Sequence, residues 1–250
     1  MADLFLLSLV GLAAGVLGGL LGIGGGVVML PLLVFWLNLP MAVAVGTSIV
    51  AVVLTAVSGS AGHMWRHNVE RDVALRSGAG GVVGSVAGSL AFPHLAGMAG
   101  ALEVGLGFLL LYTALRMVYE GVRGVGSPRR RVGRWGSLAV GLAAGAAAGV
   151  FGVGGGFLLV PAYIYLLGLS MRLSVGTSMV AFLPMALVSA AFKVGQGFVD
   201  VVDALTLGVG SLAGAQLGAW AASRAPARLL KTAFGLLFTY VALRFIGVVA

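Results

Sequence analysis

The chain has 250 residues, of which 60% are hydrophobic and only 9% are charged. A soluble domain carries roughly 25% charged residues, so this composition excludes an ordinary water-soluble protein and indicates a membrane protein. The formal net charge of +8 would suggest nucleic acid as the partner of a soluble protein, but here its placement on loops matters more, and we expect no nucleic-acid partner.

Apolar runs that match a bilayer core of about 30 Å predict five membrane segments in each half of the chain. The first half contains Leu4–Leu21, Val27–Leu37, Met41–Gly62, Val73–Phe92 and Met98–Val118. The second half contains Leu138–Phe151, Phe157–Leu167, Ser174–Phe192, Ala204–Ala222 and Leu229–Val249. Because Asp3 stands where a secretory signal peptide carries a basic residue, we expect the first run to be retained as a span.

The second segment of each half, 27–37 and 157–167, is too short for an ordinary span. Eleven helical residues at 1.5 Å each reach only about half of the hydrocarbon core. Each segment is therefore either a tilted or extended span or the returning arm of a re-entrant hairpin. Both alternatives return the chain to the same side before the next segment, so the charges do not choose between them.

Basic residues gather on one predicted face. If the N-terminus is outside, 13 of the 15 basic residues fall on one side, which the positive-inside rule assigns to the cytoplasm. Only Lys193 and Arg244 fall on the other side. The 13 residues are Arg66, Arg71, Arg76, Arg116, Arg123, Arg129, Arg130, Arg131, Arg134, Arg172, Arg224, Arg228 and Lys231.

The two halves are copies of one another. The stretch of 21 residues from Gly11 is identical at 11 positions to the stretch from Gly141, and the offset of 130 residues also relates "VGTSIVA" from Val45 to "VGTSMVA" from Val175. The predicted organisation is a first membrane repeat over residues 1–122, a basic cytoplasmic linker over 123–137 and a second repeat over 138–250.

The charges predict that the two repeats have opposite orientations. The loop before the fourth segment contains Arg66 and Arg71 in the first copy but Asp200 and Asp203 in the second. Equivalent loops therefore lie on opposite faces. Inverted-topology repeats are typical of secondary transporters, whose sites lie near the midplane where discontinuous helices meet. The predicted fold class is thus an all-α polytopic membrane protein of two inverted repeats, with short broken or re-entrant helices after the glycine-rich stretches.

Each repeat contains a dense glycine cluster that predicts a helix break. Glycine costs about 1 kcal/mol relative to alanine inside a helix, and a proline five residues on is tolerated in the first turns of a new helix. A helix beginning there offers N–H groups and a positive dipole end to an anion. The predicted structural breaks are Gly22, Pro31, Gly152 and Pro161, and the predicted substrate-binding glycines are Gly24, Gly25, Gly26, Gly154, Gly155 and Gly156.

The sequence "VGTS" follows each break and supplies candidate hydroxyl ligands. Thr47, Ser48, Thr177 and Ser178 would present four hydroxyls symmetrically about one axis. The structural alternative is equally weighted, because hydroxyls in membrane helices commonly donate to a carbonyl one turn earlier.

Two isolated basic residues occupy equivalent positions in the repeats. Lys193 corresponds to His63, and each lies at a segment end, where snorkelling to the interface is the simpler interpretation. The sharper hypothesis is that both contribute to substrate binding and that Lys193 attracts an anion into the outer vestibule. Gln216 is expected to form a hydrogen bond between helices.

No enzyme motif is present. The glycine clusters lack the third glycine of a dinucleotide fingerprint and the Lys-Ser or Lys-Thr of a phosphate loop, and no HExxH or GxSxG sequence occurs. The absence of cysteine also excludes thiolate metal sites. We expect no enzymatic activity, no metal and no cofactor.

The two glycine-rich stretches ending in proline, each followed by "VGTS", resemble the sulfite exporter TauE/SafE family of integral membrane transporters. The resemblance covers essentially the whole chain. It maps the family's glycine-rich and Thr-Ser segments onto Gly22–Pro31, Gly46–Ser48, Gly152–Pro161 and Gly176–Ser178. It implies an inner-membrane protein that moves sulfite, sulfoacetate, taurine-like sulfonates or other organosulfur anions, mostly outward.

The expected function is export of a small sulfur-containing anion by alternating access. The alternatives are a passive anion channel, a transporter of another small anion and a membrane assembly partner that transports nothing. Expected partners are a small anionic substrate, the lipid bilayer and a coupling ion, proton or sodium. Glycine recurs at every fourth residue in Gly11, Gly15, Gly19 and in Gly80, Gly84, Gly88, and we expect these stripes to pack helices closely. A homodimer stays open, because the same glycine stripes are needed within one chain. The expected location is the plasma or inner membrane, with the N-terminus outside.

Overall fold

The computed structural model describes residues 2–96, 99–123 and 133–247, so most of the predicted linker, including Arg129, Arg130 and Arg131, lies outside the described residues. Within these ranges the chain forms ten α-helices and no strands, which confirms the all-α prediction. The helices are α1 (Ala2–Leu21), α2 (Gly26–Phe35), α3 (Met41–Trp65), α4 (Arg71–Ala96), α5 (Ala99–Arg123), α6 (Arg134–Phe151), α7 (Gly156–Tyr165), α8 (Met171–Gly195), α9 (Val201–Arg224) and α10 (Ala227–Ile246).

The helices have the length and surface of a membrane protein. By length and composition, α1, α3, α8, α9 and α10 could each cross a bilayer, whereas α2, α6 and α7 are shorter apolar helices. Large apolar side chains cover the outside, with Trp65 exposed at 81%, Trp135 at 76% and Phe5 at 67%. An apolar surface of this kind suits lipid rather than water. The chain is therefore a multi-pass membrane protein.

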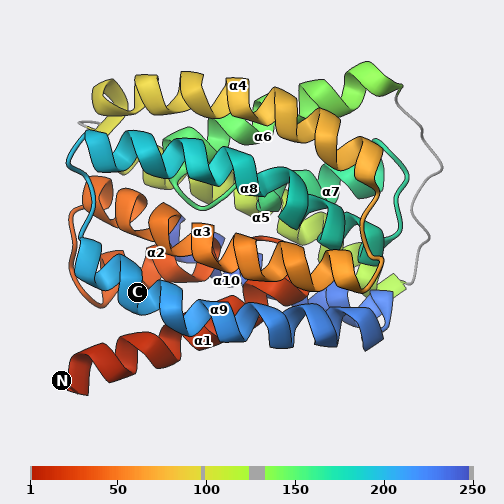
Figure 1. Cartoon of the computed structure of the whole chain (residues 1–250), viewed down its shortest axis with the longest axis horizontal. Coiled ribbons are helices and arrows are strands. Elements are labelled where there is room, and N and C mark those ends of the chain that lie inside the picture. The colour runs from red at the N-terminus through yellow and green to blue at the C-terminus, as the bar shows by residue number, and fades with distance from the viewer. Residues whose placement is uncertain (1, 97–98, 124–132, 248–250) are drawn as a thin grey trace.

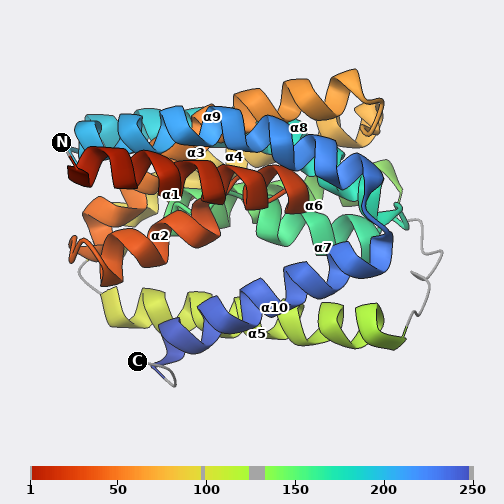
Figure 2. The ribbon, with the colours of Figure 1, turned by 90° about the horizontal axis from the view of Figure 1, so that it is seen from below.

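The two short helices return toward the end from which the preceding helix came. Figure 2 shows α2 running back beside α1, and α7 stands in the same relation to α6. Each returning arm has ten residues, about 15 Å of helix. Both helices begin one residue earlier and end two residues earlier than predicted, and Pro31 and Pro161 lie inside them.

Basic residues gather at one end of the molecule. The connections α3–α4, α7–α8 and α9–α10 meet at the right-hand end in Figure 1, while α2–α3 and α8–α9 lie at the opposite end. Arg66, Arg71, Arg172, Arg224 and Arg228 lie in or beside the first three connections. The charge separation expected from the sequence is thus a property of the fold, and which end faces the cytoplasm stays a prediction.

The closest helix packing joins the two halves of the chain to one another. Helix α1 packs on α9, α4 packs on α6, and α5 packs on α10. Helices α3 and α8 pack on each other, and in addition α3 packs on α9 and α8 packs on α4. Exchanging each helix for its equivalent in the other copy reproduces the same set of pairs, and equivalent helices such as α3 and α8 run in opposite directions (Figures 1 and 2). The inverted orientation relative to a membrane stays a prediction.

Glycine stripes allow these helices to approach backbone to backbone, as small residues do in membrane helix pairs. A Cβ placed on Gly15 in α1 would lie 2.5 Å from the Ser211 carbonyl oxygen of α9. The positions equivalent to Gly15 and Ser211 in the opposite repeats are Gly145 of α6 and Gly81 of α4, and they make the same contact. The packing role expected for the stripes is therefore confirmed.

The predicted helix breaks are present in both copies. Between α1 and α2, Gly22, Gly24 and Gly25 have φ values of 74°, 75° and 79°, and between α6 and α7, Gly152 and Gly154 have φ values of 66° and 78°. Residues with a side chain rarely adopt this left-handed conformation, so glycine is strongly favoured where one helix ends and the chain turns into the next.

Equivalent positions in the two repeats should be reachable from opposite sides of the membrane. Arg71→Cys and Val201→Cys alter exposed residues 130 positions apart, in a chain that contains no native cysteine. A membrane-impermeant maleimide should label the first variant only from the cytoplasm and the second only from outside. Labelling of both from the same side would exclude the inverted repeat.

The two breaks should respond differently to a methyl group. Gly25 has a φ of 79°, and its Cβ would lie 2.8 Å from the Ala14 carbonyl oxygen. Gly155 has a φ of −68°, and its nearest Cβ contact would be 3.1 Å. Thermal unfolding should therefore show Gly25→Ala destabilised by about 1–2 kcal/mol and Gly155→Ala clearly less. Equal destabilisation would contradict the assigned backbone conformations.

Candidate functional site

The tips of the two helical hairpins meet inside the protein. A Cβ on Gly26 would lie 2.7 Å from the Val153 carbonyl oxygen, and a Cβ on Gly156 would lie 2.7 Å from the Ile23 Cα. Residues 22–27 and 152–157 are all buried. The two glycine breaks, which are 130 residues apart in sequence, therefore form one continuous backbone contact.

The short helices begin at this contact without side-chain caps. The N-cap residues are Gly25 for α2 and Gly155 for α7, and neither helix has a side-chain hydrogen bond at its N-terminus. The first N–H groups of a helix have no partner within it, and the helix dipole places partial positive charge there. Two such ends side by side can bind an anion through N–H groups, without a metal or a cofactor.

Each serine of the "VGTS" sequences bonds to the break of the opposite copy. The Ser48 hydroxyl donates to the Gly152 carbonyl at 3.1 Å, and the Ser178 hydroxyl donates to the Gly22 carbonyl at 2.7 Å. Both hydroxyls also lie within bonding distance of a carbonyl one turn earlier, Val45 for Ser48 and Val175 for Ser178. The bond to a carbonyl of the same helix, which was the structural alternative, is therefore present in both copies. Each serine also bonds to the glycine break of the opposite repeat.

The preceding threonine and glycine hold a connection of the opposite copy. The Thr47 hydroxyl accepts from the Asp200 N–H, and the Thr177 hydroxyl accepts from the Glu70 N–H, both at 2.9 Å. The glycines admit the same connections, since a Cβ at either would overlap a backbone carbonyl there: Gly46 against Phe198 and Gly176 against Asn68. All three residues of "GTS" therefore join one half to the other, and substrate binding by the hydroxyls stays a prediction.

An aromatic side chain from α8 covers both breaks. Carbon atoms of the Phe182 ring would lie 2.6 Å from a Cβ on Gly24 and 2.8 Å from a Cβ on Gly154. Phe182 is fully buried, and the equivalent residue in the first copy is Val52, which faces Gly24. Phe182 was not among the sequence candidates. The only signal for it was the replacement of valine by a larger residue between the repeats.

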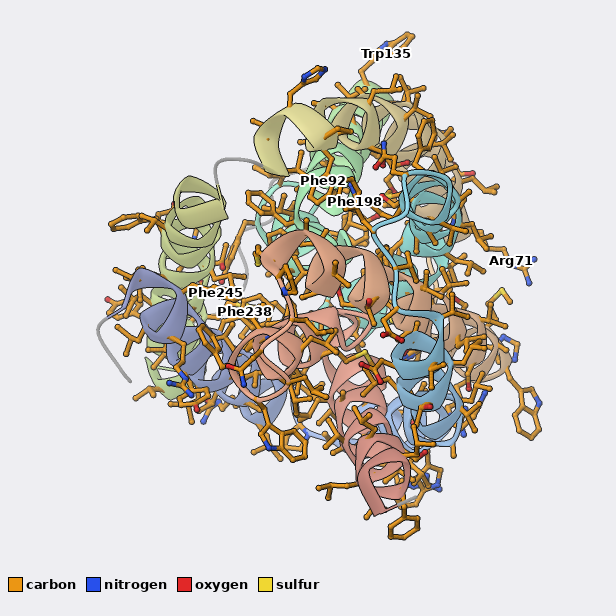
Figure 3. The ribbon with its side chains drawn as sticks, turned by 90° about the vertical axis from the view of Figure 1, so that its left-hand side faces the viewer. Arg71, Phe92, Trp135, Phe198, Phe238 and Phe245 are labelled. Carbon is orange, nitrogen blue, oxygen red and sulfur yellow. The ribbon has the colours of Figure 1, made fainter. Side chains whose placement is uncertain are left out.

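Lys193 is a buried cation near the end of α8. Its side chain is fully buried, and within the described residues its Nζ has no hydrogen-bond partner. The Nζ lies 3.1 Å from the centre of the Phe92 ring, and Phe92 packs edge-on against Phe198, as Figure 3 shows from this end of the molecule. Lys193 therefore does not snorkel to the surface, and no acidic side chain of the described chain forms an ion pair with it.

His63, the equivalent residue of the first copy, is also buried but has a protein partner. Its Nε2 lies 2.8 Å from the Gly19 carbonyl oxygen of α1, while its Nδ1 has no partner in the described part of the chain. Lys193 and His63 lie near the last turns of α8 and α3 and are not brought together at the breaks. The expected bond between helices at Gln216 is present, to the Ser58 carbonyl at 2.7 Å.

Sequence reasoning missed a buried ion pair between Glu120 of α5 and Lys231 of α10, with the exposed Arg116 beside it. Glu120 accepts from Lys231 at 3.0 Å and lies 3.5 Å from the Nε of Arg116. The Arg116 guanidinium lies 3.7 Å from the centre of the Tyr165 ring at the end of α7. Because Glu120 and Lys231 come from different helices that the sequence does not pair, only the fold identifies this contact.

Comparisons with known proteins agree with this architecture. Residues 7–245 match the family model described as Sulfite exporter TauE/SafE. A probable membrane transporter protein, YdhB of Bacillus subtilis (strain 168), is 30% identical over 232 residues, which cover 91% of this chain and 94% of the relative. A probable membrane transporter protein of Xylella fastidiosa (strain 9a5c) is 31% identical over 256 residues, covering 94% of this chain and 90% of the relative.

A more distant relative, the probable membrane transporter protein YunE of Bacillus subtilis (strain 168), is 27% identical over 244 residues and 86% of each chain. No solved structure matches this chain. The family model spans both glycine breaks, both "VGTS" sequences and all ten helices from within α1 to within α10. The chain therefore belongs to the sulfite exporter TauE/SafE family of membrane transporters.

Proposed function

We propose that this protein is a secondary transporter that exports small sulfur-containing anions, such as sulfite, taurine or sulfoacetate, by alternating access. The observation that carries the proposal is the meeting of two uncapped helix N-termini at the buried glycine breaks. Sulfite and sulfonate groups carry several oxygen acceptors, which suit a cradle of N–H groups at two positive helix ends.

In this proposal, the predicted glycines and the four hydroxyls share the site between them. The glycines provide N–H donors to the anion, whereas Ser48 and Ser178 position each break through the carbonyl of the opposite copy. Thr47 and Thr177 hold the connections that precede α9 and α4. Substrate binding thus involves both repeats at once, as expected for a midplane site between inverted halves.

Lys193 gives the proposed path its preference for anions. A buried ammonium group without an acidic neighbour favours an anion in its vicinity and disfavours a cation. It lies at the end opposite the arginine-rich connections, which supports a place in the outer portion of the path if those connections face the cytoplasm. We propose that an exported anion passes from the glycine breaks toward Lys193, driven by a proton or sodium gradient.

The conformation described here is closed around the proposed site. All residues of both breaks are buried, and Phe182 lies against Gly24 and Gly154. An anion can therefore reach the N–H groups only after the helices move apart or the Phe182 ring rotates away. Alternating access requires such a closed intermediate between the two open states.

Transport against a gradient tests the function directly. The purified protein is reconstituted in liposomes, and a proton or sodium gradient is imposed. Sulfite, taurine or sulfoacetate should then accumulate against its own concentration gradient. Equilibration that ignores both gradients would identify a passive channel. Transport of other small anions, without transport of any sulfur anion tested, would refute the proposed substrates but not the proposed transporter class.

Lys193→Met separates a transport role from a structural one. We expect it to lower sulfur-anion flux by about tenfold or more, equivalent to at least about 1.4 kcal/mol. The melting temperature should not fall, because no hydrogen bond is lost and methionine keeps a long side chain that can pack against the Phe92 ring. Arg172→Met, which removes an exposed cation, is the matched control and should retain full flux. Parallel losses of flux and folded protein in Lys193→Met would indicate a purely structural residue.

Phe182→Val makes the second copy resemble the first, where Val52 occupies the equivalent position. Removing the ring from the two breaks should raise uncoupled flux of small anions, because the closed state then excludes them less completely. The measurement is anion efflux from liposomes without an imposed ion gradient. Phe234→Val is the matched control, since that fully buried ring stacks on Phe238 within α10 rather than on the breaks. Unchanged uncoupled flux in Phe182→Val would show that the ring does not close the path.

A further inference from the structure

A basic aromatic pocket lies outside the proposed transport path, at the adjoining ends of α3 and α9. It has a volume of about 460 Å³ and is lined by Trp65, Arg66, Trp220, Ser223 and Arg224. Both helices end at the same face of the molecule as the other arginine-rich connections. The pocket is therefore located where a membrane-spanning region meets the headgroups of the predicted cytoplasmic leaflet.

The two arginines give the pocket positive charge, and no acidic side chain of the described residues pairs with either of them. Arg66 donates from Nη1 to the Gly62 carbonyl at 2.7 Å, which uses one of its five N–H donors. The Arg224 guanidinium stacks over the Trp220 ring at 4.1 Å from the ring centre. Neither arginine forms an ion pair with an acidic side chain in the part of the chain that the structure describes.

The two tryptophans show which environment surrounds the pocket. Trp65 is exposed at 81% and Trp220 at 49%, and both lie in the last turns of candidate membrane spans. Indole rings gather at the boundary between hydrocarbon and headgroups because they are apolar with one polar N–H. Exposed indoles beside two guanidinium groups therefore favour a ligand with both a phosphate and an apolar portion over a small soluble anion.

We propose that this pocket binds the phosphate of an anionic phospholipid, such as phosphatidylglycerol or cardiolipin. The two guanidinium groups donate to the phosphate oxygens, for which a planar fork of N–H groups is well matched. The Ser223 hydroxyl donates to the Trp220 carbonyl at 2.7 Å, so the arginines are the principal donors in the pocket. The exposed faces of Trp65 and Trp220 contact the glycerol and upper acyl chains.

Native mass spectrometry of protein taken from vesicles of phosphatidylglycerol and phosphatidylcholine tests this site. The wild-type chain should retain phosphatidylglycerol. The double variant Arg66→Gln with Arg224→Gln should retain at least about tenfold less of this lipid. Arg71→Gln with Arg228→Gln removes the same charge from exposed residues outside the pocket, and Arg71 points away from the helices in Figure 3. This control should bind the lipid as the wild type does.

Two further measurements test whether the bound phosphate belongs to a lipid and whether the variants are correctly folded. Millimolar inorganic phosphate or sulfite should not displace the lipid, and displacement without lipid preference would identify a soluble-anion site instead. Arg66→Lys with Arg224→Lys keeps both charges at the helix ends and should melt like the wild type, yet bind phosphatidylglycerol more weakly. Equal lipid retention by the wild type and the glutamine or lysine variants would overturn the proposal.

Discussion

Close backbone contact between helices of opposite repeats is the constraint on which the rest of this structure depends. In lipid, apolar surfaces gain little by leaving their surroundings, so helices associate through tight packing and hydrogen bonds. The glycine stripes of α1 and α6 allow that packing against α9 and α4, because any Cβ there would overlap a carbonyl group. As a result neither repeat packs mainly against itself, and each completes the core of the other.

The same reciprocity governs the glycine breaks. A break exposes backbone groups that a membrane protein must satisfy from elsewhere, and here the opposite "VGTS" sequence supplies part of that satisfaction. What stays without a side-chain partner is the N-terminal end of each short helix, at the point where the two hairpins touch. The pair of uncapped helix ends is thus held in place by residues that belong to neither hairpin.

The sequence was sufficient for the all-α fold class and the helix breaks, because hydropathy and glycine density are local signals. It was insufficient for the partners of Ser48 and Glu120, since hydrogen bonds between distant helices depend on which helices adjoin. It also assigned Lys193 to an interface, whereas the fold buries it beneath Phe92. Phe182 escaped notice because a phenylalanine in an apolar helix carries no distinguishing signal until its ring is seen to lie on two glycines.

The shared serine protons have a consequence for how the halves separate. The Ser48 hydroxyl oxygen lies 3.0 Å from the Val45 carbonyl oxygen and 3.1 Å from the Gly152 carbonyl oxygen. The hydroxyl can therefore donate to Val45 in its own helix when the opposite break moves away. Separation therefore exchanges one acceptor for another and leaves no donor stranded in a dry interior. Ser178 has the same choice, because its hydroxyl lies 2.7 Å from both the Gly22 and the Val175 carbonyl oxygens. Each serine therefore has an acceptor within its own helix that remains available when the opposite break moves away.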